Sequence, residues 1–314
     1  MKPNITEKDY PVPNTINLII VCVCSILYFV LLSIASSQIN WYWILLVSFL
    51  FGVLMIPVYT LIHEAEHNIL NTHPTVNNFM GRWLCCLFIA PFTFFKHCHY
   101  RHHKKNRTDI ELWELYQEHQ VKWKKYGNLY GMMVGLGYWS IVLSVLVFAT
   151  VPKLVYSRFF MQHTEIAGFL EGSDTKEKKR NSQWESMVVI MFQVACFIIF
   201  KFQFRGWLCC YLVHGFIWSS QNYVNHAFSP RDIINGAHNL KVPVWLKAVY
   251  LNFNLHLAHH QNPKIPWIFL PEFIKHGTHR MSFFRNYLRL WKGPRLTYEP
   301  DPAKTITYPL VQTD

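Results

Sequence analysis

The chain has 314 residues, of which 51% are hydrophobic and 17% aromatic but only 15% charged. An ordinary soluble domain carries about 25% charged residues, so this composition excludes a disordered chain and an ordinary water-soluble protein. The charges form a few belts between long uncharged runs, which is typical of a membrane protein. The formal net charge of +12 does not indicate nucleic-acid binding, because Lys and Arg lie in loops beside these runs, as the positive-inside rule predicts for cytoplasmic loops.

Five uncharged runs predict the helices of a membrane domain. A helix needs about 20 apolar residues to cross the hydrocarbon layer, and four of the runs reach that length. The fourth run along the chain is shorter, but Lys201 and Arg205 beyond its end can extend toward the headgroups. The runs are 15–35, 41–62, 127–152, 186–200 and 206–230.

The domain is expected to occupy residues 15–293, between an N-terminal tail at 1–14 and a C-terminal tail at 294–314. Glu7 and Asp9 are unsuited to a signal peptide, and the first run exceeds the usual apolar core of about 7 to 15 residues, so we expect it to remain as an anchor. The eight cysteines form no CxxC pair and are expected to be reduced, buried thiols.

The charged loops predict two transmembrane helical hairpins, 15–35 with 41–62 and 186–200 with 206–230. Run 127–152 has Lys- and Arg-rich loops on both sides, so we expect it to be re-entrant or to lie as a bent pair in the interface, with glycines permitting the bend. The stretch 83–95 contains Pro91 and is expected to be interfacial or re-entrant, or else a short buried helix. The predicted fold is an all-α integral membrane protein with a cytoplasmic-side cap.

Histidine carries the chemical information in this sequence. Seventeen are present, and nine of them fall into four motifs at the polar edges of apolar segments. On a helix, residues three or four positions apart share one face, so each motif can direct its imidazoles at one point. The motifs are His63–xxx–His67, His99–xx–His102–His103, Asn222–xxx–His226 and His256–xx–His259–His260.

These nine histidines predict a metal site. Ionisable groups near lipid are costly unless function requires them, and a neutral imidazole is a good ligand for iron, copper or zinc. Nine imidazoles are too many for one ion. The set therefore predicts two metal ions.

The order HxxxH, HxxHH, NxxxH, HxxHH resembles the membrane-bound fatty acid desaturase family, and Pro263 and Pro266 follow the last motif as is typical there. The resemblance covers residues 41–270. It implies two iron ions on the cytoplasmic side, O2 as co-substrate, and a fatty acyl substrate that is a free acid, an acyl-CoA, an acyl carrier protein conjugate or lipid-bound. Carried over position by position, the implied ligands are His63, His67, His99, His102, His103, His226, His256, His259 and His260, with Asn222 near one iron.

The resemblance implies desaturation, in which two hydrogens leave adjacent carbons and a cis double bond forms. Hydroxylation and terminal-alkene-forming decarboxylation of a fatty acid occur on the same scaffold, and the histidine motifs do not separate these outcomes. A further alternative is a membrane zinc metalloprotease, because His63–Glu–Ala–Glu–His67 also fits HExxH. That hypothesis explains only two of the nine histidines.

Carboxylates near the motifs are candidates for orienting the imidazoles through their free N–H groups. They are Glu64, Glu66, Asp109 and Asp232. His214 shares a helical face with Asn222 and His226, so it is expected either to line a substrate channel or to form a hydrogen bond between helices.

Electrons must come from outside, since the chain has no CxxCH, no four-cysteine iron–sulfur run and no GxGxxG. We expect a ferredoxin, a rubredoxin or a cytochrome with its reductase, and the basic belt would suit such an acidic carrier or an acyl carrier protein. It would also attract anionic membrane lipid. Residues 244–255 are expected to form an amphipathic helix, and residues 275–292 an interfacial segment.

Overall fold

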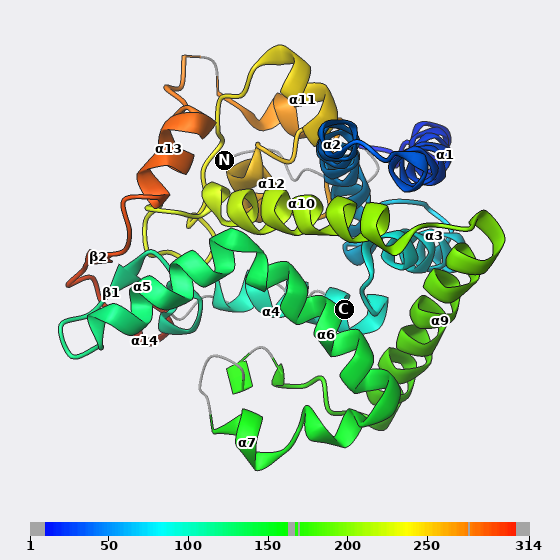
Figure 1. Ribbon diagram of the computed structural model, residues 1–314. Coiled ribbons are helices and arrows are strands. Elements are labelled where there is room, and N and C mark those ends of the chain that lie inside the picture. Colours follow the sequence, from blue (N-terminus) through cyan, green and yellow to red (C-terminus); the bar gives the residue numbers. More distant parts are fainter. Residues whose placement is uncertain (1–9, 163–166, 169, 276, 306–314) are drawn as a thin grey trace.

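The computed structural model describes residues 10–162, 167–168, 170–275 and 277–305. Helices make up most of this part of the chain (Figure 1), as the composition predicts. The described sheet has only two short parallel strands, β1 (Leu115–Tyr116) and β2 (Arg295–Leu296). The eight cysteines are free thiols, and five of them are buried.

Helices α1 (Asn14–Ser37) and α2 (Trp41–Glu66) pack against each other and match the expected first hairpin. The side chain of Asn40 caps α2 by accepting a hydrogen bond from the Tyr42 backbone N–H at 2.8 Å. Large apolar residues lie exposed on both helices, as with Ile26 at 62% and Phe49 at 54%. Such exposure suits helices whose outer faces contact lipid.

Helices α3 (Pro74–Phe88) and α4 (Phe92–Lys105) meet at an angle of 97°. The break has two local causes. Ile89 adopts a left-handed backbone conformation with φ 63°, and Pro91 precedes the first residue of α4. The apolar stretch 83–95 is therefore interrupted at its proline, and α4 leaves the corner in a new direction.

Side chains from three other helices satisfy the backbone carbonyls at the end of α3. Gln193 Nε2 donates to the Cys86 carbonyl at 2.9 Å, and the Tyr211 hydroxyl donates to the Leu87 carbonyl at 2.7 Å. The Tyr138 hydroxyl donates to the carbonyl of the following residue, Phe88, at 2.8 Å. Because lipid offers no hydrogen bonds, a broken helix at membrane depth needs such internal partners.

Helix α5 (Lys122–Gly131), the π-helical segment η3 (Met132–Leu136) and α6 (Gly137–Thr150) follow one another without a break in the chain. Gly135 has φ 118°, and the backbone nitrogen of Phe216 would lie 3.5 Å from an added Cβ. The bend expected from the glycines is thus present at Gly135. The whole 29-residue segment is nevertheless long and apolar enough to cross a membrane.

Four helical segments among the described residues meet the length and hydropathy needed to span a bilayer: α1, α2, Lys122–Thr150 and α9 (Lys176–Phe200). Helix α10 (Phe204–Asn222), expected to be half of the second hairpin, does not. Arg205, His214 and the polar residues at its end lower its hydropathy. Helix α10 instead packs between α2 and the η3–α6 region (Figure 1).

Short elements complete the chain near the histidine motifs. Helix α11 (Val244–Tyr250) is shorter than the helix expected over 244–255, because Leu251 and Asn252 adopt left-handed conformations and turn the chain back toward α12 (His256–Gln261). The other elements are η2 (Asp109–Glu111), η4 (Pro152–Leu154), α7 (Arg158–Met161), η5 (Tyr223–Asn225), η6 (Leu270–Phe273), α13 (Phe283–Leu290) and α14 (Pro302–Thr305).

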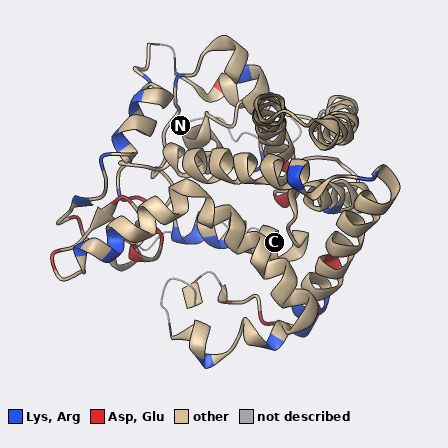
Figure 2. Ribbon diagram, viewed as in Figure 1, with Lys and Arg blue, Asp and Glu red and all other residues tan. Residues whose placement is uncertain are grey.

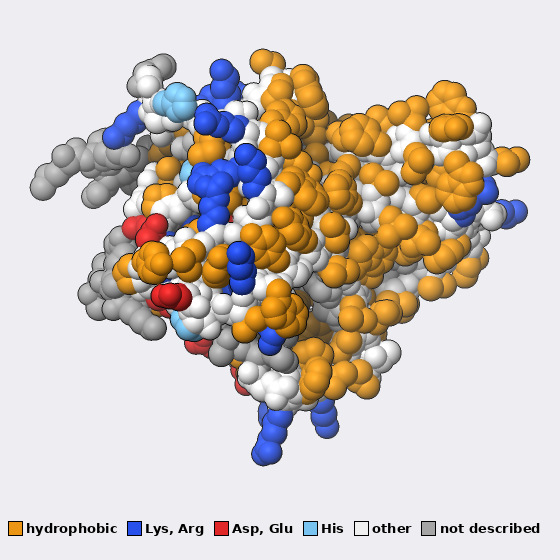
Figure 3. All heavy atoms as spheres, turned by 60° about the vertical axis from the view of Figure 1, so that its left-hand side comes forward, with side chains coloured by type: hydrophobic (Ala, Val, Ile, Leu, Met, Phe, Trp, Pro, Cys, Tyr) orange, Lys and Arg blue, Asp and Glu red, His pale blue; other side chains and the backbone are white. Residues whose placement is uncertain are grey.

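The start of the segment expected to be a C-terminal tail packs against the domain. Strand β2 pairs with β1, and Arg231 Nη1 donates to the backbone carbonyl of Glu299 at 2.6 Å. Lys and Arg lie on α4, α5, α13 and the start of α9, whereas α1 has none (Figure 2). Seen from the side of α13, apolar side chains cover much of the surface and basic side chains lie beside them (Figure 3).

Candidate metal centre

The four histidine motifs lie on helices or directly after them, and these parts of the chain meet at one place. His63 is on the last turn of α2 and His67 is its C-terminal cap, so their rings lie on one face with centroids 5.0 Å apart. Helix α4 carries the second motif and α12 the fourth. His226 follows η5 directly after α10. Segments far apart in the sequence therefore present their imidazoles to one another.

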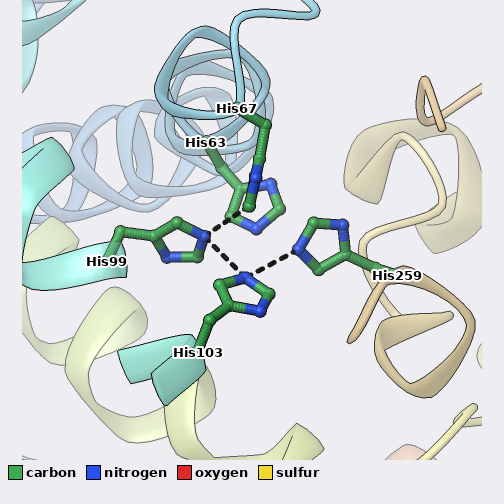
Figure 4. Close-up of side chains that lie close together, drawn as sticks. All are labelled: His63, His67, His99, His103 and His259. Carbon is green, nitrogen blue, oxygen red and sulfur yellow. Dashed lines mark hydrogen bonds between the residues drawn. The ribbon is translucent and has the colours of Figure 1, made fainter. Parts of the chain in front are cut away.

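Five of these side chains form the first histidine cluster, with one ring nitrogen of each within 4.8 Å of those of the others. His99 Nε2 lies 2.6 Å from His67 Nε2 and 3.0 Å from His103 Nε2. His259 Nε2 lies 3.1 Å from His103 Nε2. Figure 4 shows the rings converging on a common centre from α2, α4 and α12. The members are His63, His67, His99, His103 and His259.

The remaining four form the second histidine cluster, again with one ring nitrogen of each within 4.8 Å of those of the others. His102 Nε2 lies 3.1 Å from His226 Nε2. The His103 and His260 rings are stacked with centroids 4.3 Å apart, so the two clusters adjoin. The members are His102, His226, His256 and His260. All nine predicted histidines are thus brought together, in two separate groups.

The state of the ring nitrogens fits metal binding. Both nitrogens of His63 and Nε2 of His260 are buried without a hydrogen-bond partner among the described residues. Buried polar atoms normally have partners, so these nitrogens call for a ligand. An imidazole nitrogen lies about 2.1 Å from a bound transition metal, so two nitrogens on one ion are about 3 Å apart at a right angle and about 4 Å apart on opposite sides. The nitrogens of each cluster, 4.8 Å apart or less, have spacings in this range.

Burial keeps the imidazoles of His226, His256, His259 and His260 in the neutral form that binds metals. Burial, and then the neighbouring His102, lower the pKa of His256 to about 3. Burial, followed by nearby histidines, also lowers the pKa of His226, His259 and His260 well below the ordinary value. Near neutral pH, each of these rings therefore keeps a lone pair available for a metal ion.

Two imidazoles of the second cluster are oriented by acceptors on their Nδ1 atoms. His102 Nδ1 lies 2.6 Å from Glu111 Oε2, and His226 Nδ1 lies 2.9 Å from the Gly236 carbonyl oxygen. In both cases Nε2 is left to face the cluster, the arrangement that second-sphere acceptors impose on metal-binding histidines. Sequence reasoning missed both acceptors, although Glu111 is a carboxylate only two residues beyond the chosen Asp109.

The carboxylates predicted to orient histidines divide into two pairs. Glu64 Oε1 lies 3.8 Å from His63 Nδ1, and Glu66 Oε2 lies 3.7 Å from His99 Nδ1. Both are buried next to the first cluster but beyond hydrogen-bond distance of these rings. The other oxygen of Glu64 accepts a hydrogen bond from the Trp267 backbone N–H at 3.0 Å.

The second pair lies in the surrounding loops. Asp109 accepts a hydrogen bond from Arg231 Nη2 at 2.6 Å. Asp232 Oδ1 accepts hydrogen bonds from the backbone N–H groups of Ile234 and Asn235 at 2.9 and 2.6 Å. These contacts hold the loop after the third motif. An orienting role toward histidine stays a prediction for both residues.

Asn222, predicted to lie near one iron, ends α10. It lines a pocket between α2, α10 and α11. Its part in metal binding stays a prediction.

A buried ion pair fixes the second motif against the third. Arg107 Nη1 lies 2.8 Å from Glu114 Oε1, and both side chains are fully buried. Glu114 also accepts hydrogen bonds from the Tyr223 hydroxyl at 2.6 Å and from the Phe228 backbone N–H at 2.7 Å. A buried charge pair needs such additional hydrogen bonds, and losing one partner leaves an uncompensated charge. The pair thereby holds the chain on both sides of His226.

Gly236 is required by close packing in the same region. An added Cβ would lie 2.1 Å from the Asp232 carbonyl oxygen and 2.3 Å from Arg107 Cγ. The Gly236 carbonyl accepts from His226, so only glycine lets the backbone approach closely enough to orient that ring.

The pocket between α2, α10 and α11 is lined mainly by apolar and aromatic residues. Its lining includes Met55, Tyr59 and Ile217. Phe253 also lines it, and the Phe253 ring contacts His63 and His256 with centroids 5.1 and 4.7 Å apart. The pocket is narrow, with a cavity volume of about 20 Å³. His214 lines it as well, and its ring nitrogens form no hydrogen bond between helices among the described residues. A role in lining a substrate channel stays a prediction.

Comparison with known proteins agrees with this geometry. A family model described as fatty acid desaturase matches residues 39–282, a range that contains all four histidine motifs. No curated protein matches the chain. The chain belongs to the fatty acid desaturase family.

Proposed function

We propose that this membrane protein is a di-iron fatty acyl desaturase whose two iron ions are held by the nine clustered histidines. Membership of the family makes it an oxidoreductase of the desaturase or hydroxylase type that acts on a fatty acyl substrate. The observation that carries the finer proposal is the pair of histidine clusters, one with five imidazoles and one with four. Two adjoining groups of neutral nitrogen ligands suit a binuclear iron site.

Bound iron would supply the chemistry that reduces O2 and removes hydrogen from an unactivated carbon. The protein would position the acyl chain and exclude water from the site. The chain's own contribution begins with Glu111 and the Gly236 carbonyl, which fix two imidazoles. The pocket between α2 and α10 would guide the acyl chain, and Phe253 at its inner end would place one carbon beside the clusters. Holding that carbon still is what makes hydrogen removal efficient and selective.

Hydroxylation and terminal-alkene-forming decarboxylation remain alternatives within the enzyme class, since they need the same ligands. The zinc metalloprotease hypothesis has less support. Its general base would be Glu64, yet one oxygen of Glu64 accepts a hydrogen bond from the Trp267 backbone. His63 and His67 also lie among three further histidines, a set larger than one tetrahedral zinc ion uses.

Partners and orientation follow from the same proposal. The histidine motifs would face the cytoplasm, together with the Lys and Arg residues of α4 and α5 (Figure 2). An external donor such as a ferredoxin, a rubredoxin or a cytochrome with its reductase would supply electrons. The substrate would be a free acid, an acyl-CoA, an acyl carrier protein conjugate or a lipid-bound chain.

Product analysis tests the proposal. Cells that express the protein are compared with cells that express His259→Ala, and their lipids and headspace are examined by gas chromatography and mass spectrometry. Desaturation predicts a new unsaturated acid that is lost in the variant. A new hydroxy acid or a volatile alkene would select one of the alternatives. His73→Ala, an exposed histidine outside the clusters, is the matched control and should retain the product.

A further inference from the structure

The pocket between α2, α10 and α11 contains two polar side chains whose nitrogens have no partner. His214 is 1% exposed, and neither of its ring nitrogens has a hydrogen-bond partner among the described residues. The indole Nε1 of Trp218 is also buried and unpaired in the described part of the chain. The two residues are four positions apart on α10, so they share one helical face, and both line the pocket.

Three other polar residues that line this pocket, Thr60, Gln221 and Tyr250, are hydrogen-bonded. Thr60 donates to the Tyr250 carbonyl at 3.2 Å, and the Tyr250 hydroxyl donates to Gln221. Unpaired donors and acceptors are expensive at membrane depth, so two of them on one face of an apolar pocket call for a ligand.

We infer that His214 and Trp218 bind an oxygen atom carried on the hydrocarbon part of the substrate, so that the protein prefers an oxygenated acyl chain. The inference rests on the proposed acyl substrate. A hydroxyl oxygen can accept from the Trp218 N–H and donate to a neutral imidazole of His214. The pocket lining has no Lys, Arg, Asp or Glu, so a neutral oxygen fits it and a carboxylate head group does not.

The position of His214 and Trp218 would determine which carbon of the acyl chain reaches the histidine clusters. The Trp218 ring contacts Tyr59 at 5.4 Å, Tyr59 contacts Phe253 at 5.5 Å, and Phe253 lies against His63. A chain whose oxygen is held at His214 would therefore extend along these rings toward the clusters. The distance from the oxygen to the reacting carbon would then be fixed by the pocket.

Binding measurements test the inference without relying on turnover. Octadecanoic acid and a series of hydroxyoctadecanoic acids, with the hydroxyl at each carbon from 3 to 12, are titrated by calorimetry into the iron-loaded protein in lipid nanodiscs. Two neutral hydrogen bonds predict that one position, or two adjacent ones, binds about tenfold more tightly than octadecanoic acid. His214→Leu and Trp218→Phe should each reduce this preference, measured as the ratio of hydroxyoctadecanoic to octadecanoic acid affinity in the same variant, to below about threefold.

The controls separate the possible failures. His73→Leu, an exposed histidine substituted in the same way, should keep the preference. If His214→Leu does not fold, Trp218→Phe decides alone. Binding of octadecanoic acid without any preferred hydroxyl position would mean that water pairs these nitrogens and would overturn the inference, as would a preference that survives in the folded variants. Failure of every acyl probe to bind would instead contradict the proposed function.

Discussion

His102 Nε2 and His226 Nε2 lie 3.1 Å apart although 124 residues separate them in the chain. Each ring is held by a different acceptor on its other nitrogen, Glu111 for one and the Gly236 carbonyl for the other. The approach of two unprotonated nitrogens is unfavourable unless something between them carries positive charge. The short distance between these two nitrogens therefore supports metal binding by the second cluster.

Removing the carboxylate behind His102 should weaken metal binding without unfolding the protein. Glu111→Gln keeps the shape but loses the negative charge that orients and polarises the imidazole. Loss of such a partner typically lowers metal affinity about 10- to 100-fold. Competition with a chelator, followed by iron analysis, measures the change. Glu118→Gln, at an exposed carboxylate outside the clusters, is the control, and equal iron retention in both variants would refute the role of Glu111.

Gly236→Ala should disturb the second cluster through packing. The new methyl group would overlap Arg107 and the Asp232 carbonyl, and such overpacking costs about 1–3 kcal/mol of stability. Thermal unfolding in detergent measures the loss, and iron content should fall with it. Gly127→Ala is the matched control, because its Cβ would meet nothing within 4 Å and alanine favours a helix by about 1 kcal/mol over glycine. A stable Gly236→Ala protein with full iron content would contradict the packing argument.

Gln193→Leu should destabilise the corner between α3 and α4. The change removes the donor to the Cys86 carbonyl and the acceptor of the Trp207 indole N–H. A buried group left unpaired costs about 1–3 kcal/mol. Gln203→Leu, at an exposed position, should have little effect on the midpoint of thermal unfolding. If both variants unfold at the wild-type temperature, the side-chain bonds to α3 are not needed to hold the corner.

Acid should destabilise the metal-free protein well above the pH at which carboxylates titrate. The pKa of His256 is lowered to about 3 in the folded state, whereas an unfolded histidine has a pKa of about 6.5. Between these values the unfolded chain binds more protons, so the stability contributed by this group is fully present above about pH 6.5 and is lost as the pH falls toward 3. Denaturant unfolding of chelator-treated protein from pH 8 to pH 4 measures this slope. His256→Asn should flatten it, and an unchanged slope would argue against a buried neutral ring.

The sequence was sufficient for those parts of the site that follow from local spacing. The helical repeat places His63 and His67 on one face, and hydropathy locates the apolar helices. The division of the nine histidines into groups of five and four could not be predicted from the sequence. His102 and His103 are adjacent in sequence yet belong to different clusters, because α4 turns their side chains toward different neighbours.

Residues that act through long-range contacts were the hardest to predict. Glu111 contacts His102 across a turn after α4, in which Arg107 adopts a left-handed backbone conformation with φ 62°. The acceptor for His226 is a backbone carbonyl, which no residue type reveals. The apolar run at 206–230 also predicted a membrane-spanning helix, whereas α10 falls short of the hydropathy of the four candidate spans because it contains Arg205, His214 and polar residues at its end.

Metal analysis of protein purified without added metal, together with two single variants, tests the binuclear site most directly. The account predicts two irons per chain in the wild type and about one after either His259→Ala or His226→Ala, because each variant removes a ligand from a different cluster. One zinc per chain with no iron, retained in His226→Ala and lost only when His63 or His67 is replaced, would contradict it.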